Sequence, residues 1–204
     1  MLETNTSLIR RVRNAQDARS WAEFVSLYEP LLIGYVKSRG LPESDSRDVV
    51  QEIFITLLRA VPNFDLDHRK GRFRTWLWQV TMTGIADHFR RRKPQERAKD
   101  AWVERARQSG NVAPPDEADP QWETAHRKRV LEFVLPKAKA QTQPKTWHCF
   151  EQRILQGRPG PDIAKELGIT ANAVCVNAAR VLEKVRALCA EVDEEFDDAD
   201  SMSR

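Results

Sequence analysis

Aromatic and basic side chains alternate along residues 64–93. Phe64, Phe73, Trp76 and Trp78 are the aromatic members. The neighbouring cations are Arg69, Lys70, Arg72, Arg74 and the run Arg90, Arg91, Arg92 and Lys93. Bases stack on such rings at roughly 1 to 3 kcal/mol each while cations hold the backbone, so the pattern is typical of single-stranded nucleic-acid binding. The alternative is a set of core aromatics followed by a basic helix end that complements the helix dipole.

A second candidate site lies in residues 161–188, where we expect a short helix, a turn and a long helix. Pro161 opens the short helix, Gly168 makes the turn, and Thr170 caps the long helix. One face of the long helix is apolar, and its members are Val174, Ala178, Val181, Val185 and Leu188. This layout predicts a helix-turn-helix that binds duplex DNA, although a plain helical hairpin shares the pattern.

The exposed start of that long helix offers few side chains for reading bases. Its candidates are Asn172, Ala173, Val176 and Asn177, with Arg180 further along. Asn can read adenine, but the contact from Arg to guanine, the commonest specific one, is not supplied there. The phosphate contacts are therefore expected from Arg153, Arg158, Lys165 and Arg180.

Enzyme and metal chemistry find no support in the residue spacing. Asp45, Asp48 and Glu52 share a helix face, yet no His joins them at ligand spacing. The loop 62–72 fails as a calcium loop because Arg69 and Lys70 fall where an oxygen ligand and a Gly are needed. The three cysteines form no CxxC pair, and no nucleophile elbow or phosphate-binding loop occurs. We expect a protein that is not an enzyme and has no cofactor and no metal.

The charge is distributed in blocks. The net charge of +3 divides into +5 over residues 1–95, −3 over 96–125, +7 over 126–190 and −6 over 191–204. Two basic blocks indicate two modules that each meet a polyanion. The sequence has no apolar run near the roughly 20 residues of a membrane helix, and residues 1–14 lack the apolar core of a secretory signal. A cytoplasmic protein without membrane insertion is therefore expected.

Few glycines and little β-type alternation predict an all-α fold of two small helical domains joined by a linker. The first helix is expected to start at a capping box of Ser20 and Glu23, with a break or kink at Pro30. A second helix should start near Asp45 and run to Pro62, and a third should cover residues 73–93. Trp102 and Trp122 indicate that the linker docks somewhere, and Pro136 should follow the helix that surrounds residues 126–135.

The order of these parts resembles the extracytoplasmic-function sigma factors of bacterial RNA polymerase, the minimal two-domain branch of the sigma-70 family. The segment SDSRDVVQEIFITLLR is similar to the polymerase-binding helix, with Asp48, Gln51, Glu52 and Phe54 in its DxxQExF pattern. The promoter-melting helix is matched at Phe73, Trp76, Leu77, Asp87, Arg90 and Arg91. The segment DIAKELGITANAVCVNAARVLEKVR is similar to the C-terminal promoter reader.

The resemblance implies four segments: sigma region 2 over residues 1–94, a linker over 95–122, a region 4 helix-turn-helix over 123–190 and an acidic tail over 191–204. It implies DNA-templated transcription initiation, with core RNA polymerase and promoter DNA, both duplex and single-stranded, as partners, and possible control by an anti-sigma factor. The linker would thread the polymerase cleft. The tail either solvates the chain end or folds back on the basic second module.

The resemblance also assigns residues to three contacts. The β′ clamp of the polymerase would meet Asp48, Gln51, Glu52 and Ile55, and the second domain would touch the β flap. The minus-ten set is Asn63, Phe64, Arg72, Arg74, Trp76, Trp78, Thr83, Asp87, Arg90 and Arg91, with the loop from Asn63 to Gly71 holding a flipped base. The minus-thirty-five set is Arg158, Thr170, Asn172, Ala173, Val176, Asn177 and Arg180.

The chain departs from the family pattern in two helices. Thr83 stands where the melting helix usually has Asn, and Cys175 and Asn177 stand where many members have Lys or Arg. The base preference at both contacts is therefore open. The main rival is a helix-turn-helix transcriptional regulator that binds duplex DNA without polymerase, and a second rival is a regulator that titrates a protein partner.

Overall fold

The computed structural model describes residues 7–64, 73–91 and 119–193. These residues form helices and contain no strand, which confirms the all-α prediction. They divide into two compact units, one of Leu8–Arg129 and one that begins at Val130. Each unit is described by itself below.

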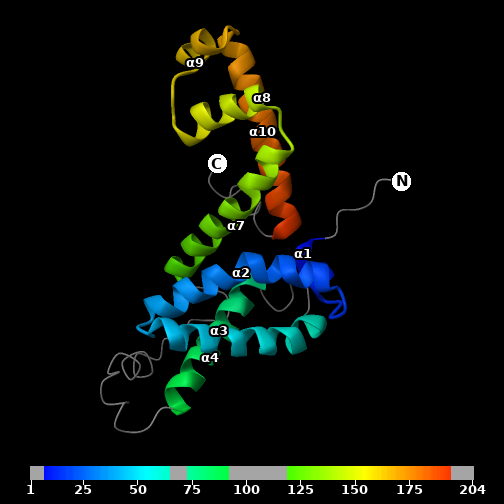
Figure 1. Ribbon diagram of the computed structural model, residues 1–204, viewed down its shortest axis with the longest axis vertical. Helices are drawn as coiled ribbons and strands as arrows, with labels where there is room; N and C mark the ends of the chain where they lie inside the picture. The colour runs from blue at the N-terminus through cyan, green and yellow to red at the C-terminus, as the bar shows by residue number, and fades with distance from the viewer. Residues whose placement is uncertain (1–6, 65–72, 92–118, 194–204) are drawn as a thin grey trace. The chain divides into compact units, whose positions relative to one another are not determined.

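The helices of the first unit are drawn in blue to green in Figure 1. They are α1 (Leu8–Val12), α2 (Ala18–Ser38), α3 (Glu43–Ala60), a 3-10 turn η1 (Val61–Asn63), α4 (Phe73–Arg91) and the start of α7 (Pro120–Ala140). Helix α3 packs against both α2 and α4, and α1 packs against α2. The core between them is aromatic and aliphatic, with Phe24, Tyr28, Ile53 and Leu77 fully or almost fully buried.

The start of α2 lies one turn from the predicted capping box. Asp17 is the N-cap, and its carboxylate accepts hydrogen bonds from the Ser20 N–H at 3.0 Å and the Ser20 hydroxyl at 2.7 Å. Glu23 pairs with Arg11 at 2.9 Å instead of capping the helix. The hydrogen bonds from Ser20 lower the pKa of Asp17. The Ser20 prediction was therefore wrong, because a better acceptor precedes it.

Helix α3 buries one row of apolar side chains. Val49, Ile53 and Leu57 are buried, whereas Leu58 is 45% exposed. The helix begins at Glu43 after Pro42, two residues before the predicted cap at Asp45. Asp45 instead lies 3.4 Å from His88 of α4.

The second unit contains the rest of α7, α8 (Pro144–Phe150), a π-helical turn η2 (Glu151–Leu155), α9 (Gly160–Leu167) and α10 (Ala171–Val192). Helix α7 continues through Pro136 to Ala140, so the predicted end at that proline was wrong. The predicted helix-turn-helix is confirmed. Gly168 has φ +63°, a left-handed conformation that suits glycine, and the Thr170 hydroxyl accepts from the Ala173 N–H at 3.1 Å.

The helix-turn-helix has its own small core. Ile163 and Ala164 of α9 pack with Cys149 and Val174, and Leu167 and Ile169 cover this cluster. The inner face of α10 is buried over its whole length, as the spacing predicted, and consists of Val174, Ala178, Val181, Val185 and Leu188. The outer face of α10 is thereby presented away from the core.

Candidate polymerase and promoter interfaces

The predicted polymerase-binding residues share one exposed face of α3. Asp48 lies three and four residues before Gln51 and Glu52, Ile55 lies four and three residues after them, and all four are exposed. Ile55 is 51% exposed, and Leu58, one turn further on, extends the apolar part of this face. An apolar pair beside acidic and amide groups has the chemistry of a protein-docking face.

Glu52 connects this face to α4. The Arg91 guanidinium donates from Nη1 to Oε1 of Glu52 at 2.9 Å, and its Nη2 pairs with Oε2. The hydrogen bonds between the two groups lower the pKa of Glu52 and raise the pKa of Arg91. Because both side chains are exposed, solvent screens this pair and it contributes little to stability. A predicted polymerase contact and a predicted DNA contact are thus paired with each other.

The predicted minus-ten residues fall into three groups by accessibility. Asn63, Thr83, Arg90 and Arg91 are exposed, while Trp76 and Asp87 are half-buried. Phe64, Arg74 and Trp78 are buried. Arg72 and the loop 65–71 lie outside the described residues.

Trp76 belongs to an aromatic cluster at the start of α4. Its ring centroid lies 4.7 Å from that of Phe64 and 5.5 Å from that of Phe73, which in turn contacts Phe24 and Tyr28. Trp76 is therefore held by the core on one side and accessible on the other.

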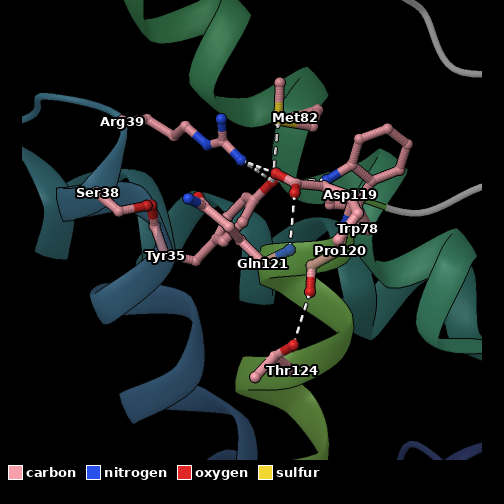
Figure 2. Close-up of polar contacts among 9 residues, drawn as sticks. All are labelled: Tyr35, Ser38, Arg39, Trp78, Met82, Asp119, Pro120, Gln121 and Thr124. Atoms are coloured by element: carbon pink, nitrogen blue, oxygen red, sulfur yellow. Dashed lines mark hydrogen bonds and ion pairs between the residues drawn. The ribbon is translucent and has the colours of Figure 1, made fainter.

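Trp78 is engaged in a polar network with α2 and the start of α7, shown in Figure 2. Its indole N–H donates to the Tyr35 hydroxyl at 2.7 Å, and Tyr35 donates to Oδ2 of Asp119 at 3.0 Å. The Arg39 guanidinium donates to the Tyr35 hydroxyl at 2.6 Å and forms an ion pair with Asp119. Burial raises the pKa of Tyr35 to about 12, so the phenol is neutral in this network.

Asp119 also starts α7. Its Oδ1 accepts from the Gln121 N–H at 2.8 Å, and Pro120 follows it as the first helical residue. Partial burial opposes ionisation of Asp119, but the hydrogen bonds from Gln121 and Tyr35 and the charge of Arg39 prevail and lower its pKa. One carboxylate thus caps α7 and holds it to α2.

The first turns of α7 dock on the first unit through further contacts. Trp122 is fully buried, and its indole N–H donates to the Arg74 carbonyl at 3.1 Å. The Arg74 side chain forms an ion pair with Glu123 at 3.1 Å. The His126 ring lies 5.8 Å from the Tyr28 ring, centroid to centroid. The docking expected from Trp122 is confirmed, whereas Trp102 lies outside the described residues.

Helix α2 passes through Pro30 without the predicted break because Arg129 of α7 assists it. Arg129 donates from Nη2 to the Ser26 carbonyl at 2.7 Å and from Nε to the Leu27 carbonyl at 2.9 Å. Proline has no N–H, so the carbonyl four residues earlier, that of Ser26, needs another donor. Sequence reasoning missed Arg129, since only the tertiary structure brings it to α2.

The outer face of α10 differs in part from the predicted reading set. Asn172, Val176 and Arg180 are exposed, but Ala173 and Asn177 are half-buried on the side toward α8. The Asn177 amide lies 3.8 Å from the Cys149 sulfur. Two exposed neighbours of Asn172 and Val176, Cys175 and Ala179, complete the outward stripe, and helical spacing alone identifies them. Thr170, also in the predicted set, is exposed and caps α10.

Arg158 is held near the turn of the helix-turn-helix. Its guanidinium donates to Gln152 at 2.6 Å and to Glu166 at 3.0 Å. Glu166 also contacts His148 at 3.1 Å, and the hydrogen bonds from Arg158 and His148 lower the pKa of Glu166. Arg158 is positioned by these contacts rather than freely extended.

Residues 7–64, 73–91 and 119–193 hold no group of His, Cys, Asp and Glu side chains that could bind a metal ion. No helix among them is long and apolar enough to cross a membrane.

Sequence comparisons with known proteins agree on one family. The sigma-70 region 2 model matches residues 24–95. The RNA polymerase sigma factor NccH of Alcaligenes xylosoxydans xylosoxydans is 30% identical over 89% of this chain and 92% of its own length. The sigma factor CnrH of Cupriavidus metallidurans is 27% identical over 83% and 86%. A solved structure of CnrH in complex with the cytosolic domain of CnrY has a TM-score of 0.36 and 21% identity, covering 89% of this chain and 94% of that one. The chain belongs to the extracytoplasmic-function sigma factors of the sigma-70 family, which serve RNA polymerase in transcription.

Proposed function

We propose that this sigma factor binds core RNA polymerase through the outer face of α3, melts the minus-ten element with α4 and reads the minus-thirty-five element with α10. The exposed face of α3 carries the proposal, because it places two exposed apolar side chains, Ile55 and Leu58, beside the acidic and amide groups of Asp48, Gln51 and Glu52. The factor acts in the cytoplasm, uses no cofactor and performs no chemistry itself.

The α3 face fits the clamp helices of the polymerase β′ subunit. Burial of Ile55 and Leu58, 51% and 45% exposed in this structure, would supply apolar free energy at about 25 cal/mol per Å². Asp48 and Glu52 would set the orientation through complementary charge on the partner. Glu52 would have to exchange its pairing with Arg91, or share it, when polymerase binds.

Promoter melting is assigned to the accessible stripe of α4. Trp76, Thr83, Asp87 and Arg90 are spaced by three, four or seven residues and lie along one side of the helix. Unstacking costs about a few kcal/mol per base step, and stacking on Trp76 together with the cation of Arg90 would offset it. Arg74 and Trp78 are proposed to act indirectly, because both are buried and fasten α7.

The second unit is proposed to bind duplex DNA and the β flap. Thr170 caps the reading helix and Arg180 is available to the phosphate backbone beside the stripe. An anti-sigma protein that covers the exposed face of α3 would prevent polymerase binding, and this face is the proposed point of control.

Charge reversal on α3 separates this function from the rival regulator that works without polymerase. Asp48→Lys should lower the yield of co-purified core polymerase at least about tenfold. The reason is that two like charges facing each other across an interface cost several kcal/mol of binding free energy. Run-off transcription should fall in parallel. Glu29→Lys is the matched control, because Glu29 is exposed on α2 of the same unit. Unchanged polymerase binding by Asp48→Lys, with intact DNA binding, would favour the rival.

A further inference from the structure

We propose that α10 reads A·T pairs, with Asn172 recognising adenine and Val176 and Ala179 contacting the thymine methyl group. This inference rests on the proposed function, because it names the base pairs that the same DNA-reading helix would recognise. It differs from a general DNA-binding role because it excludes guanine as the principal contact.

The outward stripe of α10 is uncharged over its first turns. Asn172, Cys175, Val176 and Ala179 are all exposed and follow each other at intervals of three, one and three residues. Val176 is 40% exposed, which makes it the most prominent apolar group on this face. The opposite face is closed against the core by Val174 and Ala178. The stripe therefore offers one amide and a row of small apolar groups.

The length of the stripe suits a short stretch of major groove. Seven residues separate Asn172 from Ala179, which is about 10 Å along the helix axis. About three base-pair steps cover that distance. Glu183, exposed one turn beyond Ala179, brings a negative charge toward the phosphates and limits how much further the helix can enter.

The chemistry of the stripe discriminates between base pairs. In the major groove, Asn binds the N6 and N7 of adenine in bidentate fashion, apolar side chains contact the thymine methyl, and guanine is read by Arg or Lys. The first cation of α10 is Arg180, which lies beside the stripe and is placed to contact phosphate. No residue of the stripe before it can donate two hydrogen bonds to guanine O6 and N7 as Arg does.

The neighbouring candidates are already engaged. The Asn177 amide is directed to the Cys149 sulfur at 3.8 Å, so Asn172 is the amide that faces outward. Arg158 donates to Gln152 and Glu166 and is held at the edge of the motif. Neither residue supplies a guanine contact from the centre of the reading face.

The test is a selection from duplexes randomised at the upstream element, run in two arms. One arm uses the full-length chain alone at low salt, and the other uses the chain bound to core polymerase. Both arms should enrich A·T pairs at adjacent positions, and Asn172→Ala should lower the preference for adenine by about tenfold or more. Val176→Arg should shift the preference at one position toward guanine.

A chemical substitution in the DNA tests the methyl contact separately. Replacing the selected thymine by uracil removes one methyl group and should weaken binding by about fourfold. Val176→Ala should reduce this difference at the thymine that Val176 contacts, because only one of its three side-chain carbons remains, and should leave the contact of Ala179 unchanged. Ile154→Ala should retain the full difference, because Ile154 is similarly exposed at 45% but lies outside α10.

The outcomes separate the two proposals. Enrichment of G·C pairs in both arms, the absence of any base preference in both arms, or a thymine-to-uracil loss that is the same size at every selected thymine in Val176→Ala as in the natural chain would overturn the inference. Failure of core polymerase to bind in the second arm would overturn the proposed function, and the free-chain arm would still decide the base preference.

Discussion

Arg129 supplies to α2 the hydrogen bond that Pro30 cannot make. Its guanidinium lies 2.7 Å from the Ser26 carbonyl, the group that the N–H of residue 30 would bind in an ordinary helix, and 2.9 Å from the Leu27 carbonyl. Pro30 thus creates a binding site for a side chain of α7 in the middle of α2. The same contact keeps α2 helical through the proline and fastens the first turns of α7 to the first unit.

We expect the effects of Arg129 and Pro30 to be coupled. Arg129→Met should lower the free energy of unfolding by about 1 to 3 kcal/mol, because the Ser26 carbonyl loses a charged donor. In a Pro30→Ala background the main-chain N–H returns to Ser26, so Arg129→Met should cost less. Urea denaturation of the natural chain, the two single variants and the double variant gives the coupling energy between Arg129 and Pro30, which should exceed about 0.5 kcal/mol.

Arg127 provides the control for this cycle, since it is exposed on the same helix. Arg127→Met should change the free energy of unfolding by no more than about 0.5 kcal/mol in either background. An equal cost of Arg129→Met with and without Pro30 would show that the arginine does not compensate for the proline.

The two tryptophans of α4 should behave differently. Trp76→Ala should reduce open-complex formation while core polymerase binding is retained, because Trp76 is half-buried and accessible on one side. Trp78→Ala should lower the free energy of unfolding by about 3 to 5 kcal/mol, because it empties a buried site and breaks the hydrogen bond to Tyr35. Permanganate footprinting, polymerase co-purification and urea denaturation measure the three effects. A loss of stability in Trp76→Ala as large as that in Trp78→Ala would contradict the assignment of Trp76 to DNA melting and of Trp78 to the core.

The Tyr35 network should make stability sensitive to alkaline pH. The pKa of Tyr35 is raised from 10.0 to about 12 in the folded chain, so its neutral form is favoured by folding. That contribution is complete below pH 10.0 and is lost as the pH rises through about 12. With allowance for solvent screening, the free energy of unfolding of the natural chain should fall over this interval by about 1 to 2 kcal/mol more than that of Tyr35→Phe. Parallel pH profiles of the two chains would rule out this role for Tyr35.

The helix-turn-helix could be predicted from sequence because its signals are local. Gly168, the Thr170 cap and the stripe beginning at Val174 each determine their own geometry within a few residues. The course of α2 through Pro30 could not be predicted, since the compensating Arg129 lies far away in the chain. The burial of Arg74 had the same kind of cause, because Glu123 of α7, distant in the chain, pairs with it.

Gly84 should be required where α4 crosses α3, whereas Gly34 in α2 should not. A Cβ at position 84 would lie 2.9 Å from Cγ1 of Ile53, which is buried and cannot move away freely, so Gly84→Ala should destabilise the chain by about 1 to 3 kcal/mol. A Cβ at position 34 would meet nothing within 4 Å. Gly34→Ala should therefore stabilise the chain by about 0.5 to 1 kcal/mol, because alanine loses less backbone entropy in a helix. Urea denaturation measures both, and stabilisation by Gly84→Ala would show that the two helices do not approach as closely as these distances require.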